Sequence, residues 1–350
     1  GGRLPEAVQI ELRDLDQSAL NVEALHDEEV LTRAKAALAS RDPQGVLNEL
    51  NALTESGARG DSARSVQSRA QLWNELVSKW TGGVLPKGVT IALGDLDRGD
   101  SNVEALYDEE VLTRAKAALA SSDPQAVLNE LDALTKSGGR GAIAKGLRSR
   151  AKLWTELAGK WHESVLPEEV LFALRHLDQS ASEVKILYDE TVFVRARGSL
   201  ASSDPEGVLS ELSALTDNGA KSVPAKELRS RALLWTNLEA RWRAGALPEE
   251  VQVALLNLGR PDSDVENLHN EKAISLAKDA LESSDPQGAL NELDALTLNG
   301  AKSAQAKGLS SRAQLWKELR ESWGVPDLPS DVVVALKVTT GDLGVAEAKY

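Results

Sequence analysis

The amino-acid sequence predicts an all-α fold, an α-solenoid built from helix pairs of about 40 residues. One observation is a Leu-Pro pair that returns at a constant interval of 81 residues. A second is the spacing of apolar residues by three or four positions, which is the period of a helix. A third is that no stretch alternates apolar and polar residues for long enough to indicate a sheet. The Leu-Pro pairs begin at Leu4, Leu85, Leu166, Leu247 and Leu328.

The interval divides the chain into four sequence repeats. Asp-Pro pairs at Asp42, Asp123, Asp204 and Asp285 keep the same spacing of 81 residues. We therefore expect four units and a remainder, which is a partial repeat or a C-terminal cap. Repeat 1 covers residues 3–83, repeat 2 covers 84–164, repeat 3 covers 165–245, repeat 4 covers 246–326, and the remainder is 327–350.

Each repeat is itself a degenerate duplication, as repeat 3 illustrates. The segments 167–177 and 205–215 share a proline, a glutamate, a valine and three leucines at equal positions. Each half therefore reads as a short helix followed by a longer one. Helix pairs of this kind cover the apolar faces of their neighbours, so that stability is nearly additive along the stack.

The first half of repeat 3 begins with a short helix that Pro167 opens, because proline fits the first helical position. Val170, Leu174 and Leu177 form one apolar stripe along this helix. A turn follows at 178–182. We expect a long helix over 182–202, with Val184, Leu187, Val192, Val194, Ala196 and Leu200 as its apolar residues.

The second half of repeat 3 begins at Asp204, whose carboxylate can cap the helix that Pro205 opens. We expect a turn at 217–219. A long helix is then expected over 225–243, because apolar residues follow at helical spacing. These residues are Leu228, Ala232, Trp235, Leu238 and Trp242.

The eight tryptophans of the chain form four pairs seven residues apart, which places both indoles of a pair on one helix face. They could line aromatic pockets, but repetition at helical spacing favours core or inter-repeat packing. We expect one member of each pair to be partly exposed and the second member to lie at the joint between units. The pairs are Trp73 and Trp80, Trp154 and Trp161, Trp235 and Trp242, and Trp316 and Trp323.

One arginine recurs within a Ser-Arg-Ala triplet of each repeat. It could belong to a ladder of anion-binding guanidiniums. We favour an ion pair or a helix-end hydrogen bond, because the guanidinium fork suits a fixed geometry. Repetition also favours a structural role, because a ligand site usually breaks repeat symmetry. The four residues are Arg69, Arg150, Arg231 and Arg312.

The sequence contains no recognisable catalytic or metal-binding constellation. His26 and His269 share a register with Tyr107 and Tyr188, which indicates a half-buried ring with a polar tip. No second histidine lies three or four residues away, so that a metal site or an acid-base pair is poorly supported. The acidic runs 27–29 and 108–110 lack the ligand pattern of a calcium loop and indicate a solvated first helical turn.

Glycine-rich segments at 57–60 and 138–141 are not phosphate loops, because no strand precedes them and no Lys-Ser or Lys-Thr follows. They indicate mobile turns between helices. Together with 179–183 and 259–264, they are candidate specificity elements because their sequences differ between repeats. We expect no cofactor and no catalysis within these residues.

Composition narrows the classes of partner. The formal net charge is −14 and no lysine- or arginine-rich run occurs, so that we expect no nucleic acid partner. No apolar run is long enough to span a bilayer, and we expect no membrane association. The chain lacks cysteine, which excludes disulfides and thiolate metal sites. It also lacks methionine, which together with Gly1 and Gly2 indicates a processed or cloned fragment.

The junction between the tryptophan helix and the Leu-Pro pair resembles the tandem WY/LWY repeats of secreted oomycete effectors. The resemblance covers nearly the whole chain and implies that Trp80, Trp161, Trp242 and Trp323 are the family tryptophans. A second similarity is to the SKWP-repeat effectors of plant-pathogenic bacteria, and HEAT-like solenoids are a third. The residues that carry the first are Ala70–Trp73, Trp80, Pro86, Val89, Leu93, Leu96, Asp97, Asn102 and Leu106, and 127–136 carries the second.

The first two resemblances imply a secreted virulence protein that is delivered into a host cell and binds host proteins. From the residues themselves we expect a non-enzymatic, monomeric scaffold with a protein partner. Residues that vary between repeats, such as Lys87, Glu168 and Gln252, would then carry the specificity. Two alternatives are a spacer or self-assembling repeat protein without a discrete ligand, and an enzyme whose catalytic domain lies outside these residues.

Overall fold

The computed structural model describes residues 6–242, 245–323 and 328–337, and the side chains among them from residue 21 onward. These residues form 19 α-helices and one short 3₁₀ helix, and no strand occurs among them. The expected all-α fold is therefore confirmed. The helices fall into two compact units, one made of residues 1–158 and 168–181, and the other of 159–167 and 182–350.

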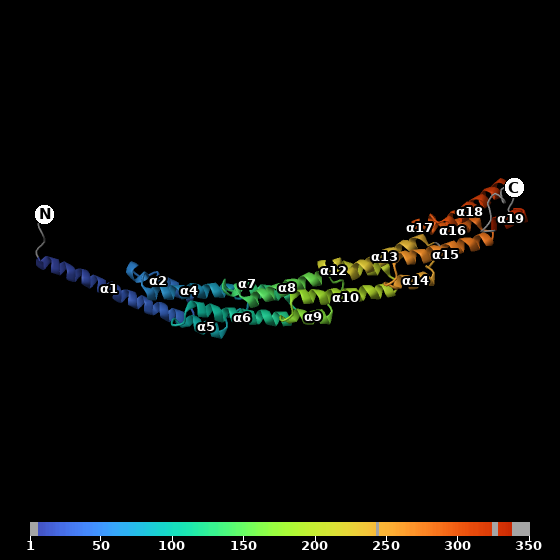
Figure 1. The fold of residues 1–350 in the computed structure, drawn as a ribbon. Helices are drawn as coiled ribbons and strands as arrows, with labels where there is room; N and C mark the ends of the chain where they lie inside the picture. Colours follow the sequence, from blue (N-terminus) through green and yellow to red (C-terminus); the bar gives the residue numbers. More distant parts are fainter. Residues whose placement is uncertain (1–5, 243–244, 324–327, 338–350) are drawn as a thin grey trace, which may run out of the picture. The chain divides into compact units, whose positions relative to one another are not determined.

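The first unit packs its shorter helices against longer ones. Helix α2 lies against α1 and α4, and α7 lies against α6 (Figure 1). The helices that belong wholly or mainly to this unit are α1 (Glu6–Ala39), α2 (Pro43–Leu50), α3 (Glu55–Ala58), α4 (Asp61–Lys79), α5 (Lys87–Gly94), α6 (Asp100–Ala120), α7 (Pro124–Asp132), η1 (Gly138–Arg140), α8 (Ala142–Lys160) and α9 (Glu168–Arg175).

The second unit uses the same kind of packing, with α11 against α13 and α16 against both α15 and α18. Its helices are α10 (Ala181–Ala201), α11 (Pro205–Ser213), α12 (Asp217–Lys221), α13 (Val223–Arg241), α14 (Glu249–Leu256), α15 (Asp262–Glu282), α16 (Pro286–Asp294), α17 (Leu298–Ala301), α18 (Ala304–Trp323) and α19 (Ser330–Lys337).

Helix boundaries follow the residues that the sequence singled out. In α11 the carboxylate of Asp204 accepts a hydrogen bond from the Gly207 amide at 2.8 Å, and Pro205 occupies the first turn, as expected. The long helix before it ends with Ser203 in the left-handed region, at φ 60°. The Asp204 amide then donates to the Ser199 carbonyl, which is the Schellman pattern that closes a helix.

The residues 217–219 differ from the expected turn. They begin a short helix, α12, because the hydroxyl of Thr216 accepts from the Gly219 amide and caps its first turn.

A larger difference lies in repeat 1. Repeats 2 to 4 interrupt their first half between a short and a long helix, whereas α1 runs without a break from Glu6 to Ala39. In the later repeats an arginine of the preceding repeat binds carbonyls of the interrupting turn, for example Arg69 on Asp95. In α1 the corresponding residues are part of the continuous helix.

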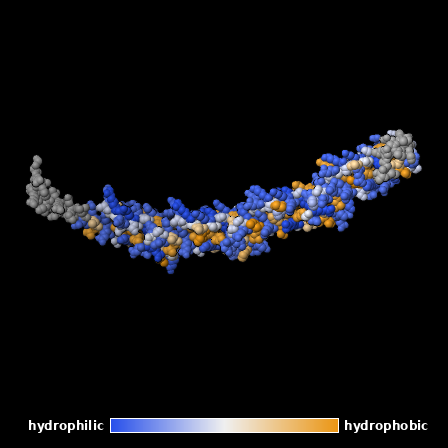
Figure 2. Space-filling model, in the orientation of Figure 1, coloured by the Kyte–Doolittle hydropathy of each residue, from blue (hydrophilic) through white to orange (hydrophobic). Residues whose placement is uncertain are grey.

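The core follows one stripe along each long helix. On α10 the buried residues Val184, Tyr188, Val192, Ala196 and Leu200 follow every fourth position. Figure 2 shows a largely hydrophilic surface on which hydrophobic residues are scattered in small groups. Val194, one of the apolar residues expected on this helix, is 66% exposed, because it lies half a turn from that stripe.

Candidate functional site

The recurring arginines bind the ends of neighbouring helices. The guanidinium of Arg231 is buried and pairs with Asp262 at 3.1 Å. It also donates to the carbonyls of Ala254 at 2.8 Å and Asn257 at 3.1 Å. These acceptors lie at the end of α14 and the start of α15, so that one side chain from α13 fixes both helices.

Arg69 and Arg150 occupy the same place in other repeats. Arg69 pairs with Asp100 at 2.7 Å and donates to carbonyls that include that of Ala92, at 2.8 Å. Arg150 donates to the carbonyls of Ala173, at 3.3 Å, and Gln179, but the register of Asp100 holds Ala181. Burial lowers the pKa of Arg150. Arg312 is buried as well. The contacts of the first three arginines are those of helix-end hydrogen bonds, not of an exposed anion ladder.

The tryptophans are packed more deeply than the sequence indicated. Six of the eight are buried, including both members of the pairs in repeats 2 and 3, Trp154 with Trp161 and Trp235 with Trp242. The expectation of one partly exposed member therefore fails for these two pairs. It holds for Trp80, which is half-buried, and for Trp323, which is 38% exposed, beside the buried Trp73 and Trp316.

The second tryptophan of a pair contacts an aromatic ring of the next repeat. The ring centroids of Trp80 and Tyr107 are 5.7 Å apart in an edge-to-face arrangement, and Trp161 contacts Tyr188 in the same way. In the fourth repeat, His269 takes the place of the tyrosine against Trp242, at 5.2 Å.

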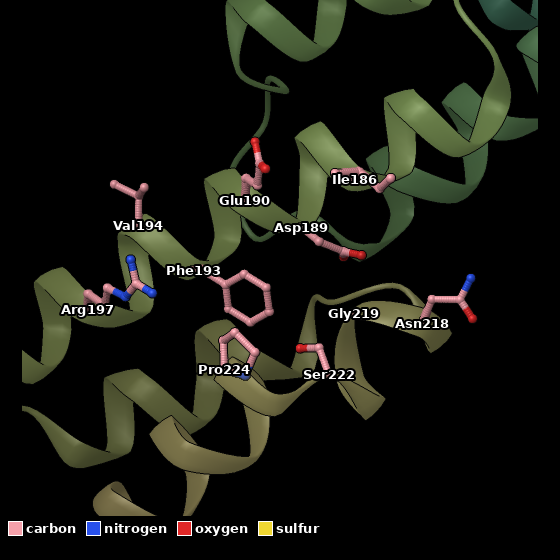
Figure 3. A pocket seen from close by; sticks show the side chains of 10 residues that line it. All are labelled: Ile186, Asp189, Glu190, Phe193, Val194, Arg197, Asn218, Gly219, Ser222 and Pro224. Atoms are coloured by element: carbon pink, nitrogen blue, oxygen red, sulfur yellow. The ribbon is translucent and has the colours of Figure 1, made fainter. Parts of the chain in front are cut away.

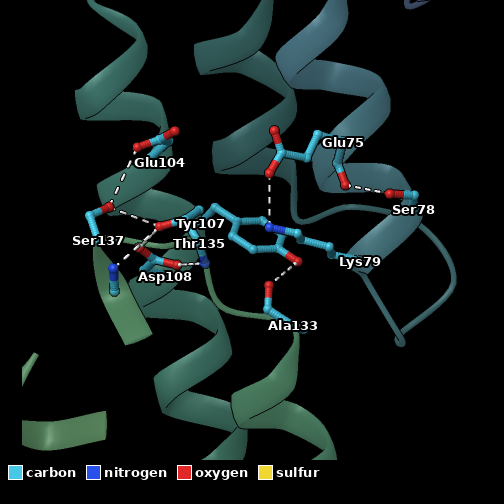
Figure 4. Close-up of polar contacts among 10 residues, drawn as sticks. Glu75, Ser78, Lys79, Glu104, Tyr107, Asp108, Ala133, Thr135 and Ser137 are labelled. Carbon is cyan, nitrogen blue, oxygen red and sulfur yellow. Dashed lines mark hydrogen bonds and ion pairs between the residues drawn. The ribbon is translucent and has the colours of Figure 1, made fainter. Parts of the chain in front are cut away.

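The exchange of tyrosine for histidine had indicated half-buried rings at this register, and this prediction was wrong. Tyr107, Tyr188 and His269 are fully buried, and only His26 is exposed. The hydroxyl of Tyr107 donates to the Ala133 carbonyl at 3.1 Å (Figure 4), so the polar tip is satisfied inside the protein. Burial raises the pKa of Tyr107 to about 12.

An arginine covers two of these tryptophans. The guanidinium of Arg114 lies 4.7 Å from the centre of the Trp80 ring and pairs with Glu130 at 2.6 Å. Arg195 stands in the same relation to Trp161 and pairs with Glu211 at 2.8 Å. The corresponding residue of repeat 4 is Leu276.

A second network, which the sequence did not reveal, links the middle of a long helix to a turn 27 residues later. The carboxylate of Asp108 accepts from the amide of Thr135 at 2.8 Å and from its hydroxyl at 2.5 Å (Figure 4). The threonine hydroxyl in turn accepts from the Gly138 amide. A Cβ at Gly138 would lie 2.2 Å from that carboxylate, so only glycine fits. We call this set of hydrogen bonds the brace. The same brace joins Asp27 to Thr54, Asp189 to Thr216, and Asn270 to Thr297.

The brace corrects two expectations about these segments. Asp27 and Asp108 do not lie in a solvated first turn, because they are buried in the interior of α1 and α6. Hydrogen bonds from Thr54 hold the pKa of Asp27 below its ordinary value of 3.8. The segment 57–60 begins with the last two residues of α3, and the segment 138–141 contains the 3₁₀ helix η1; the brace holds both. Among the described residues, no group of three or more acidic or histidine side chains is placed to hold a metal ion.

The other candidate specificity segments also carry structural contacts. Gln179, in the segment 179–183, gives its carbonyl to Arg150, and Asp262, in the segment 259–264, pairs with Arg231. Lys87 and Glu168 are exposed at the start of α5 and α9, whereas Gln252 donates to the Leu247 carbonyl.

Each short helix that follows a Leu-Pro pair exposes one apolar residue that sequence reasoning missed. Each residue lies two positions after a buried valine, which is the signal that could have revealed it, since that spacing points away from the core. In the first unit these residues are Ile91 (59% exposed) and Phe172 (56%), and in the second they are Val253 (60%) and Val334 (60%).

No protein-family model, curated protein or solved structure matches this chain. Over the part of the chain that the structure describes, no helix has both the length and the apolar character that crossing a membrane requires.

Proposed function

We propose that the chain is a non-enzymatic α-solenoid whose four repeats form a scaffold that binds other proteins. The observation that carries the proposal is the apolar residue exposed at the same register of the four short helices that follow a Leu-Pro pair: Ile91, Phe172, Val253 and Val334. These large apolar side chains gain nothing from exposure in the folded chain, whereas a partner surface would bury them. Charged neighbours such as Lys87 and Glu168 differ between repeats and would set specificity.

The buried contacts support a structural role for the interior of each repeat and a binding role for its exposed residues. Three kinds of buried contact occur with similar geometry in several repeats: the hydrogen bonds of the arginines to helix-end carbonyls, the tryptophan-aromatic pairs and the Asp-Thr brace. A rigid frame of this kind leaves the exposed positions free to diverge.

The resemblance to WY/LWY repeats extends the proposal to a setting. Its basis is the sequence of the tryptophan helix and the Leu-Pro pair, in which Trp80, Trp161, Trp242 and Trp323 correspond to the family tryptophans. On this resemblance we propose that the scaffold acts, as a secreted pathogen effector, on proteins inside a host cell.

The test is affinity capture from plant cell extract with four forms of bait. The wild-type protein is compared with a variant that carries Ile91→Asp, Phe172→Asp, Val253→Asp and Val334→Asp. A second variant combines Lys87→Glu with Glu168→Lys. The matched control carries Gln71→Asp, Lys152→Asp and Gln314→Asp, at exposed polar positions of the tryptophan helices. Circular dichroism verifies that all four proteins are folded.

A few stoichiometric proteins captured by the wild type and the control, and lost with the aspartate variant, would support a scaffold that uses the short helices. Capture that is unchanged in both surface variants would contradict this choice of surface. If no protein is captured, and the bait is folded and associates with itself, the proposal would be replaced by the alternative of a self-assembling spacer. Light scattering on the purified protein measures that association directly.

A further inference from the structure

A groove in the second unit runs along α10 and ends against the turn that leads into α13 (Figure 3). Its volume is about 660 Å³. Ile186, Phe193 and Val194 line it from α10, and Pro224 lines it from the first turn of α13. Two of these side chains are widely exposed, Ile186 at 57% and Val194 at 66%.

Three of the four apolar lining residues are particular to repeat 3, whereas the fourth, Phe193, corresponds to Leu31, Leu112 and Ile274 and keeps to the repeat pattern. The core stripe beneath it keeps its valine or alanine in every repeat, for example at Val184 and Ala196. The positions of Ile186, Val194 and Pro224 change instead, and in the other repeats they are mostly small or polar. Ile186 corresponds to Ala24, Ala105 and Asn267; Val194 corresponds to Thr32, Thr113 and Ser275; and Pro224 corresponds to Ser62, Ile143 and Gln305. A departure of this kind from repeat symmetry is typical of a binding site rather than of packing between repeats.

The charges in the groove indicate the polarity of its occupant. Glu190 and Arg197 lie seven residues apart on the same face of α10, about 10 Å along the helix axis. Among the described residues neither side chain has a hydrogen-bond or ion-pair partner. A partner that covers the apolar residues would bring both charges out of water, which is favourable only if it supplies opposite charges.

The surrounding fold limits the form of the occupant. An extended peptide commonly binds by adding to a sheet edge, and the described part of the chain contains no strand that could offer one. A ridge of side chains along α10, bounded by the start of α13, instead suits a second helix that packs into the groove. The stretch from Ile186 to Arg197 is about 16 Å long, which matches about three turns of such a helix.

We propose that this groove binds one amphipathic helix of a partner protein, an inference that rests on the scaffold function proposed above. Apolar residues of that helix, spaced by three and four positions, lie on Ile186, Phe193 and Val194. A lysine or arginine of the helix faces Glu190, and an aspartate or glutamate faces Arg197.

The experiment is selection of binders from a display library of random peptides of about 20 residues, long enough for several helical turns. The bait is the full chain, and the library is depleted against an Ile186→Ala, Val194→Thr variant, which gives these positions the residues of repeat 2. Enriched peptides are synthesised and measured by fluorescence anisotropy. We expect helical peptides with apolar residues at three- and four-residue spacing and one basic residue among them. Their affinity should be weaker by about tenfold or more for the variant, because the lost apolar contacts are worth more than about 1.4 kcal/mol.

A gain-of-binding variant controls for a loss of binding that is caused only by a disturbed fold. Ala105→Ile, Leu112→Phe and Thr113→Val, with Ile143→Pro, give repeat 2 the lining of repeat 3. This variant should bind the same peptides at a second site, which titration detects as an increased stoichiometry.

Three outcomes would overturn the inference: enrichment of proline-rich, non-helical peptides, equal binding to the wild type and the depleted variant, or no enrichment at all. The plant-extract capture distinguishes these from a failure of the scaffold function. If captured proteins still bind the Ile186→Ala, Val194→Thr variant, the scaffold stands and the groove is not the site. If no protein binds any form of the chain, the scaffold itself is wrong.

Discussion

The imidazole of His269 lies edge-to-face against the indole of Trp242, with ring centroids 5.2 Å apart, where the two preceding repeats place a tyrosine. Its side chain is fully buried, and neither ring nitrogen has a hydrogen-bond partner among the described residues. Burial, together with the positive charge of Arg241, lowers the pKa of His269 below its ordinary value of 6.5. The imidazole is therefore buried in its neutral form.

His269 makes folding sensitive to mild acid. Since its pKa is lower in the folded state, the unfolded chain binds the proton first as the pH falls. Its contribution to stability is fully present above about pH 6.5 and decreases as the pH falls below that value. We expect His269→Tyr to remove this loss and to add about 1 kcal/mol, because a tyrosine hydroxyl can reach the Ala295 carbonyl as Tyr188 reaches Ala214.

Thermal unfolding across a pH series measures the effect. The control is His26→Tyr, the same substitution at the equivalent but exposed position. It should leave the acid-dependent loss in place. Unchanged pH dependence in His269→Tyr would contradict the assignment of the loss to this residue.

Arg69 pairs with Asp100 and Arg231 pairs with Asp262, but no carboxylate stands at the corresponding position for Arg150. Ala181 occupies that register, at the first position of α10. We expect Ala181→Asp to stabilise the protein by about 1 kcal/mol, since a new charge-assisted contact forms and an acidic residue is favourable at a helix start.

A double-mutant cycle checks this expectation. Urea unfolding of Ala181→Asp is compared in the wild-type and Arg150→Met backgrounds. The gain should shrink to the small helix-dipole contribution when the arginine is absent. A gain of equal size in both backgrounds would show that no ion pair forms.

The brace between Asp108, Thr135 and Gly138 should tolerate an asparagine at position 108 but not the removal of the polar side chain. Asn270 already fills this place in repeat 4, where its amide nitrogen donates to the Thr297 hydroxyl at 2.9 Å. We expect Asp108→Asn to have a small effect, whereas Asp108→Ala should cost about 1–3 kcal/mol by leaving a buried amide and hydroxyl unsatisfied. Gly138→Ala should also destabilise, because its Cβ would overlap the carboxylate.

Chemical denaturation of these three variants provides the measurement, with Gly139→Ala as the matched control. A Cβ at Gly139 meets no atom within 4 Å. If Asp108→Ala were as stable as Asp108→Asn, the brace would contribute nothing to folding.

These contacts also show how far the sequence could lead. The helix that begins at Asp204-Pro205 and the structural role of Arg69 follow from local chemistry and repetition, and both were expected. The brace was not, because Asp108 and Thr135 are 27 residues apart and meet only once α6 and α7 are packed. An acidic run on a helix gives no local sign that its first carboxylate is buried.

The same limit applies to the candidate binding surfaces. The apolar residues expected on the helix 182–202 include Val194, but the buried stripe of α10 follows every fourth residue and leaves this valine exposed. The unbroken α1 could not be foreseen from residues 13–19 either, since repeat 3 interrupts its helix with a similar Asp-Gln-Ser turn at 178–180.

Ser203 closes α10 in a left-handed conformation at φ 60°, where a side chain is strained. We expect Ser203→Gly to stabilise the protein by about 0.5–1 kcal/mol, since relief of that strain outweighs the added freedom of the unfolded chain. The neighbouring Ser202→Gly is the control and should destabilise, because Ser202 lies outside the left-handed region and its hydroxyl bonds the Gly198 carbonyl. Melting temperatures of the two variants should shift in opposite directions; shifts of the same sign would refute the strain argument.

Leu276 leaves Glu292 without the arginine that pairs with Glu130 and Glu211 in the preceding repeats. Burial raises the pKa of Glu292 above its ordinary value of 4.5. Because the folded state holds the proton more tightly than the unfolded chain, this glutamate reduces stability as the pH rises above about 4.5. The direction is opposite to that of His269, so that the two pH dependences partly offset each other between about pH 4.5 and 6.5.

Leu276→Arg should reverse the effect of Glu292 and restore the cation over Trp242. We expect a gain of about 1 kcal/mol at neutral pH, from a cation–π contact and a partly exposed ion pair. The converse, Arg114→Leu, should cost a similar amount. Stability measured against pH separates the contributions: with Leu276→Arg the decrease above pH 4.5 should disappear, and in Leu276→Arg combined with Glu292→Gln only the cation–π gain should remain. A Leu276→Arg protein that loses stability would mean that the leucine packs against Trp242 more favourably than the guanidinium does.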